Sequence, residues 1–156
     1  MMRTDELENA MQSAINFQEL VASAGDGIMA ADASGAITLW NPACERLFGF
    51  TVAEALGKSL DLIIPQRQQK PHWDGYHKTI ATGITKYGND VLRVPAVHKE
   101  GHTLSIAFTV SMLHTADGKV SAIVAVIRDE SVKFAEERQL RKRVMELEAQ
   151  LAKTKS

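Results

Sequence analysis

The chain has 156 residues, 45% of them hydrophobic and 24% charged, which is enough for one globular domain with a real core. A formal net charge of −1 gives no support for electrostatic binding to nucleic acid or to an acidic membrane surface. The single cysteine, Cys44, excludes an internal disulfide, and no apolar run is long enough to span a membrane. The N-terminal sequence also lacks the charged-then-apolar order of a signal peptide, so we expect a cytoplasmic protein.

Residues 1–24 predict an amphipathic helix. Asp5 can cap this helix, with Glu8 three residues later, and Gly25 and Gly27 end it. Its apolar stripe consists of Leu7, Met11, Ala14, Ile15, Gln18 and Val21.

A pair of strands and two short helices are predicted next. Residues 28–31 and 37–40 are short apolar runs separated by the turn sequence at 32–35. Asparagine caps a helix and proline has the backbone angle of a first helical residue, so Asn41-Pro42 favours a helix start.

The second short helix is indicated by a capping box. Thr51 and Glu54 have the required spacing, and Gly57 is a suitable end. The stretch from Ile63 to Gly83 then begins with a proline-closed apolar step and continues in a helical pattern. We expect any cofactor to bind at this stretch.

The last third of the domain predicts three strands. Apolar and polar residues alternate strictly from Leu104 to Met112, which is the pattern of a strand with one buried face. Pro95 favours an edge position or a bulge for the preceding strand. The other segments are strands at 87–97 and 120–127 and turns at 99–101 and 115–118.

A helix is predicted from Ser131 onward. Its leucine and valine residues have heptad spacing and are flanked by charges, which is typical of a coiled-coil seam. Two heptads are too short for a stable isolated coiled coil, so a homodimer through the terminal helices would need contacts from the domain. The seam consists of Leu140, Val144, Leu147 and Leu151.

This order of elements predicts an α+β fold, with a five-stranded antiparallel sheet, short helices on one face, and amphipathic helices at both ends. Between about Phe17 and Asp129 the chain resembles the PAS domain. The motifs that carry the resemblance are Asp26-Gly27-Ile28, Asp32-Ala33-Ser34-Gly35, Trp40-Asn41-Pro42-Ala43, Leu47-Phe48-Gly49-Phe50, Glu54-Ala55-Leu56-Gly57-Lys58, Lys99-Glu100-Gly101 and Ile127-Arg128-Asp129.

The resemblance implies signal transduction and not enzymatic activity. PAS domains sense signals, dimerise or do both, and most transmit a change from the sheet to a following helix. The expected organisation is an N-terminal helix at 1–24, a sensor domain at 25–130 and a signalling helix at 131–156 that acts on a downstream signalling protein. The sequence contains no HExxH motif, phosphate-cradling glycine loop or Ser/His/Asp order that argues for catalysis.

The fold alone does not decide the cofactor. A flavin photosensor of this family needs a reactive cysteine in an Asn-Cys-Arg motif, where this chain has residues 59–64 and no cysteine. A coumaryl photosensor also needs a pocket cysteine, and Cys44 lies on the wrong helix. Haem b remains.

His72 corresponds to the iron-ligating histidine of the haem-binding PAS gas sensors, both the rhizobial sensor-kinase kind and the bacterial phosphodiesterase kind. The phosphodiesterase kind has a proline seven residues before this histidine and a glycine eleven residues after it, as Pro65 and Gly83 stand here. A neutral imidazole is a suitable axial ligand for haem iron. The resemblance also implies that Lys78 and Lys86 lie near the haem propionates.

The implied pocket walls are apolar residues of the last three strands, although the sequence leaves open which face of the final strand points inward. They are Leu92, Val94, Phe108, Val110, Ile123, Val124 and Ile127.

The chain departs from the family pattern on the gas-binding side. The distal arginine of the family falls at Leu92, and the distal methionine of the phosphodiesterase kind falls at Asp90. Loss of a donor weakens polar stabilisation of bound O₂ more than binding of CO. The predicted ligand is therefore O₂, CO or NO, and the candidate donors to oxygen are Tyr87, Asn89 and Trp73.

Two other functions stay open: a cofactor-free PAS module for dimerisation and protein interaction, and binding of a small metabolite in the same pocket. His98 and His102 bracket a turn and can share a zinc ion, although such pairs are more often solvated. His77 and His114 are expected to be exposed, and Cys44 to be a small buried apolar residue.

Overall fold

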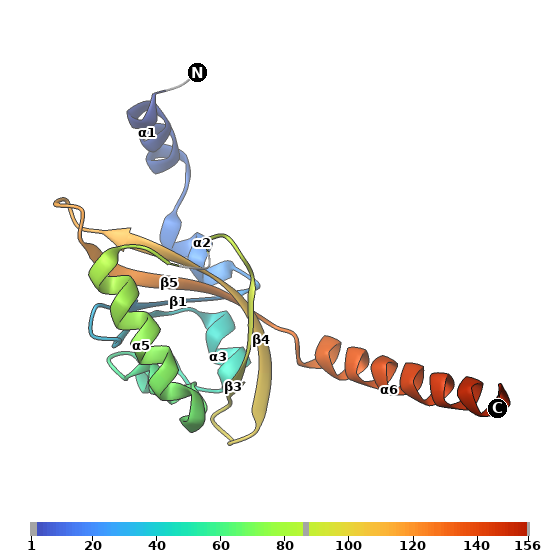
Figure 1. Ribbon diagram of the computed structural model, residues 1–156. Helices are drawn as coiled ribbons and strands as arrows, with labels where there is room; N and C mark the ends of the chain where they lie inside the picture. The colour runs from blue at the N-terminus through green and yellow to red at the C-terminus, as the bar shows by residue number, and fades with distance from the viewer. Residues whose placement is uncertain (1–2, 86–87, 156) are drawn as a thin grey trace.

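The computed structural model describes residues 3–85 and 88–155 (Figure 1). One antiparallel sheet with the strand order β2-β1-β5-β4-β3 forms the centre of the domain, which confirms the predicted five-stranded α+β fold. Its strands are β1 (Gly27–Asp32), β2 (Ile37–Trp40), β3 (Leu92–Val97), β4 (Thr103–His114) and β5 (Val120–Asp129).

The short helices between β2 and β3 lie together on one face of the sheet, while the C-terminal helix projects away from the domain (Figure 1). In the described part of the chain, no helix is long and apolar enough to cross a membrane. The helices are α1 (Thr4–Ala14), α2 (Phe17–Ser23), α3 (Pro42–Phe48), α4 (Val52–Ala55), the 3₁₀ helix η1 (Leu60–Leu62), α5 (Gln66–Thr82) and α6 (Ser131–Thr154).

The predicted starts of α3 and α4 and the glycine end of α5 are confirmed. The side chain of Asn41 accepts a hydrogen bond from the backbone N–H of Cys44, with Pro42 in the first turn of α3. Thr51 and Glu54 form both hydrogen bonds of the capping box on α4. Gly83, with a φ of +69°, ends α5.

The single N-terminal helix predicted for residues 1–24 is wrong. The chain forms two helices, because the Asn16 side chain accepts a hydrogen bond from the Glu19 N–H and starts a new helix inside the apolar stripe. Asp5 lies within the first turn of α1 and does not precede it. The strand predicted from residue 87 begins only at Leu92, and it lies at the sheet edge, as Pro95 indicated.

The register of β5 settles which face of this strand points toward the helices. Ile127 is paired with Phe108 on β4, and Ile123 is paired with Ala31 on β1. Directly opposite residues share a face, so the helix-covered face of β5 carries Ile123 and Ile127. Val124 points to the other face, and its assignment to the pocket wall is wrong.

The core lies between this face and the helices. Cys44 on α3 is fully buried, and burial raises the pKa of its thiol to about 12, as expected of a small apolar residue. The largest fully buried side chains besides Cys44 are Phe48, Ile37 and Ile127.

Candidate functional site

Helix α5 presents one side to the helix-covered face of the sheet. His72, Tyr76 and Ile80 follow each other at intervals of four residues, which places them along one face of the helix. Tyr76 is buried, and His72 and Ile80 are half-buried, so this face points into the domain. His77 is exposed, as predicted.

The His72 imidazole has an unpartnered nitrogen. Its Nδ1 atom is buried and has no hydrogen-bond partner among the described residues. Burial lowers the pKa of His72, and the charge of nearby Asp61 opposes this shift only in part. The ring is therefore neutral at pH 7 and offers a lone pair, as an axial haem ligand must. A buried polar atom without a partner costs about 1–3 kcal/mol, which a ligand to the ring can recover.

Two aromatic rings flank His72, and each is held by a hydrogen bond to a residue outside α5. The ring centroid of His72 lies 4.8 Å from that of Trp73 and 5.7 Å from that of Tyr76. Trp73 donates its indole N–H to Asp61 Oδ1 at 2.7 Å, and the Tyr76 hydroxyl donates to the Asp32 carbonyl at 2.5 Å. Burial raises the pKa of Tyr76 to about 12, so its hydroxyl stays protonated and remains a donor.

Of these two neighbours of His72, Trp73 was predicted only as a donor to oxygen, and Tyr76 was not identified from the sequence. The four-residue spacing from His72 to Tyr76 was a signal that could have identified the tyrosine. The contact of Trp73 with Gly35 had no such signal. A Cβ atom at Gly35 would lie 2.1 Å from the indole ring, so the close packing of Trp73 on this turn depends on glycine.

Apart from Val124, the predicted pocket walls lie on one face of the sheet but are unequally covered. Phe108, Ile123 and Ile127 pack against the core. Leu92 and Val110 are half-buried, and Val94 is 38% exposed. The β3 side of this face is thus apolar and only partly covered.

Among the predicted polar residues that the structure describes, only Trp73 contacts the His72 ring. Lys78 is exposed on α5, and Asn89 is exposed before β3. Lys86 and Tyr87 lie outside the described residues. Trp73 is wrong as a donor to oxygen, because its N–H is bonded to Asp61 and it adjoins His72 on the same helix.

Two surface hollows lie elsewhere on the domain. One of about 510 Å³ is lined by Pro65, Gln66, Arg67, Pro95 and Thr103. The other, of about 250 Å³, includes Ile127 among its lining residues. Neither is lined by His72. The neutral His72 ring is a suitable kind of ligand for haem iron, and neither of these two hollows reaches it.

The family follows from comparison with known proteins. Residues 15–129 match the family model described as PAS fold. The chain belongs to the PAS family. This agrees with the sheet order and with the helices on one face.

Two curated relatives of this PAS domain are sensors by name. The oxygen sensor protein DosP of Escherichia coli is 27% identical over 109 residues, and the sensor protein FixL of Bradyrhizobium diazoefficiens is 23% identical over 148 residues. The matches cover 70% and 94% of this chain but only 13% and 28% of the relatives. The chain therefore corresponds to one segment of each, a PAS signal-sensing domain.

Solved structures support the fold. The PAS domain of a Colwellia psychrerythraea protein has a TM-score of 0.65 at 17% identity and covers 74% of this chain and 94% of that one. An RNA-binding Light-Oxygen-Voltage receptor also has a TM-score of 0.65, at 19% identity, and covers 93% of this chain and 39% of that one. At such identities the likeness shows the fold alone.

Proposed function

We propose that this PAS domain is a haem-based gas sensor in which His72 is the axial ligand of the iron. The observation that carries the proposal is the buried Nδ1 of His72, which has no partner in the described residues and belongs to a neutral ring. The apolar face of β3, β4 and β5 would form the walls of the porphyrin site. Haem would supply the iron on which a diatomic gas binds.

The names of the relatives and the position of the single cysteine support haem over flavin. One relative is an oxygen sensor by name. Cys44 lies on α3, and its Sγ would be 3.0 Å from a Cβ atom placed at Gly27. The stretch 59–64, where the flavin photosensors of this family carry their reactive cysteine, contains none.

CO and NO are favoured over O₂ as the sensed gas. Leu92, at the place of the family's distal arginine, lies on the helix-covered face opposite Phe108 and donates no hydrogen bond from its side chain. Bound O₂ depends more than CO on such a donor.

The signal would reach α6 through the end of β5. The Glu130 N–H donates to the Ser105 carbonyl at 2.8 Å, and the Ser105 N–H donates to Ser131 Oγ at 3.0 Å. A displacement of β4 or β5 therefore acts directly on the first residues of α6. The exposed seam of α6 would form a homodimer in the cytoplasm and act on a downstream signalling protein. Leu140, Val144, Leu147 and Leu151 are 65, 52, 42 and 59% exposed in this chain.

The absorption spectrum of protein expressed with haem tests the proposal. We expect a Soret band at about one haem per chain, lost in His72→Ala. His77→Ala is the matched control, because it removes an exposed histidine from the same helix, and it should keep the band.

Two outcomes contradict the proposal. A colourless wild-type protein would leave the cofactor-free dimerisation module as the better function, which the exposed seam of α6 already favours. A Soret band that persists in His72→Ala would show that another residue holds the iron. Circular dichroism of each variant confirms that the fold is intact.

A further inference from the structure

The hairpin between β3 and β4 holds two histidines directly opposite each other. The His98 N–H donates to the His102 carbonyl at 3.0 Å, and the Gly101 N–H donates to the His98 carbonyl at 2.8 Å. Gly101 has a φ of +94°, the left-handed conformation that such a three-residue loop requires. Opposite residues at the end of a hairpin carry their side chains on the same side.

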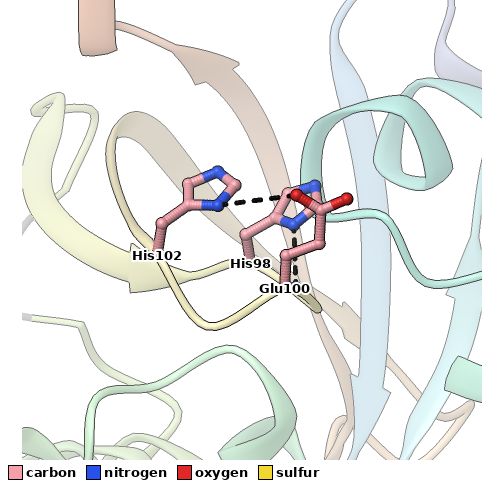
Figure 2. Close-up of side chains that lie close together, drawn as sticks. All are labelled: His98, Glu100 and His102. Atoms are coloured by element: carbon pink, nitrogen blue, oxygen red, sulfur yellow. Dashed lines mark hydrogen bonds and ion pairs between the residues drawn. The ribbon is translucent and has the colours of Figure 1, made fainter.

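Glu100, at the tip of the loop, adds a carboxylate to this pair (Figure 2). The two imidazole rings are stacked, with centroids 4.4 Å apart and an interplanar angle of 17°. Glu100 Oε2 lies 4.0 Å from His102 Nδ1. One ligand atom from each of the three residues falls within 4.8 Å of the others.

We propose that His98, Glu100 and His102 bind a divalent transition-metal ion, with Zn²⁺ as the first candidate. Two imidazoles and one carboxylate form a ligand set that Zn²⁺ accepts, with a fourth position left for water. Ligand bonds of about 2.0–2.2 Å place ligand atoms roughly 3–4 Å apart, so the three groups need to close by less than about 2 Å. Glu100 and His102 are exposed and free to make this movement.

The base of the hairpin is already fixed on the rest of the domain. Lys99 pairs with Glu54 on α4 at 2.6 Å, and its N–H donates to the Phe48 carbonyl at 2.9 Å. The His98 ring lies against Gly49, where an added Cβ atom would approach it to 2.6 Å. A loop held in this way loses less conformational freedom when it binds an ion.

The hydrogen bonding of the His98 ring is compatible with metal binding. Its Nδ1 accepts a hydrogen bond from the Glu100 N–H at 3.1 Å, which assigns the lone pair to this nitrogen. A metal ion at Nδ1 would replace this single exposed hydrogen bond. Lys99, the cation of the loop, directs its ammonium to Glu54 and away from the proposed ligands.

Calorimetric titration of the untagged chain with ZnCl₂ tests this inference. We expect one equivalent of Zn²⁺ to bind. His102→Ala and Glu100→Gln should each weaken Zn²⁺ binding by more than roughly 10- to 100-fold, which is the effect of losing only a residue that hydrogen-bonds to a metal ligand. Both residues are exposed, so neither change should disturb folding. Replacement of His98 is avoided because its ring packs on Gly49.

The matched control is His114→Ala, which removes an exposed histidine from the far end of β4. It should leave Zn²⁺ binding unchanged, and so should His72→Ala, which separates this site from the proposed haem site. Wild-type protein that does not bind Zn²⁺ would overturn the inference. Equal loss of binding in His114→Ala and His102→Ala would also overturn it, because binding would then be distributed over surface histidines.

Discussion

Asn41 connects three segments of the domain through one buried side chain. It is only 3% exposed and is the one buried polar residue in the described chain. Its Oδ1 accepts from the N–H groups of Ile28 and Cys44 at 2.9 and 3.1 Å. Its Nδ2 donates to the carbonyls of Val21 and Asp26 at 3.0 and 3.1 Å. It thereby joins α2, the start of β1 and the start of α3.

Asn41→Ala should destabilise the domain strongly. Loss of the cap on α3 costs about 1 kcal/mol, and each other group left without its partner costs about 1 kcal/mol where water does not replace it. The three such groups are the N–H of Ile28 and the carbonyls of Val21 and Asp26, so the total loss of stability is about 3–4 kcal/mol. This is a large share of the roughly 5–15 kcal/mol by which domains are usually stable.

Urea denaturation followed by circular dichroism measures the loss, with Asn16→Ala as the matched control. Asn16 also caps a helix, through one hydrogen bond to the Glu19 N–H at 3.0 Å, but it is exposed. Its replacement should cost only about 0.5–1 kcal/mol. Equal losses in the two variants would refute the reasoning, because they would show that only the cap, and not the buried network, contributes at Asn41.

Two further predictions concern the turns that hold the helices in place. Hydrogen bonds from Lys99 and Thr51 lower the pKa of Glu54 to about 2. The ionised Glu54 carboxylate should therefore stabilise the folded domain fully above about pH 4.5, and this contribution should disappear as the pH falls toward 2. The urea midpoint of Glu54→Gln should therefore lie below that of the wild type at pH 7 and converge with it in acid, and a constant difference would contradict this. Gly35→Ala should lower the melting temperature more than Gly118→Ala, because both glycines have a φ near +85° but only Gly35 contacts a side chain, that of Trp73. Equal losses would show that the contact is unimportant.

Local signals in the sequence predicted the capped helices well. The Asn41-Pro42 start and the capping box of Thr51 and Glu54 act within four residues, so neighbouring side chains alone determine them. The prediction of one N-terminal helix was wrong because a local signal, the helix cap at Asn16, was overlooked. The cap at Asn16 interrupts an apolar stripe whose periodicity continues through the break.

Contacts between distant segments could not be predicted. The hydrogen bond from Tyr76 to the Asp32 carbonyl joins residues 44 positions apart, and the packing of Trp73 on Gly35 joins residues 38 positions apart. The inward face of β5 was also undecided, because it depends on the register with β1 and β4 and not on the composition of β5. His72 could be singled out from the resemblance to the haem-binding PAS sensors, but its unpartnered nitrogen could not be predicted.

The proposed sensor site and the terminal helix share the same two strands. Ile127 is fully buried on the helix-covered face and is paired with Phe108. Two residues later, the carboxylate of Asp129 accepts a hydrogen bond from the Ser131 N–H at 2.9 Å. Helix α6 has no buried residue of its own, and hydrogen bonds of Ser131 to Ser105 on β4 and Asp129 on β5 attach its first residue to the domain. A shift of the inner face would meet little resistance from α6 and would change its direction more readily than it would distort the packed core. For this reason a gas bound near His72 would affect α6 before the rest of the domain.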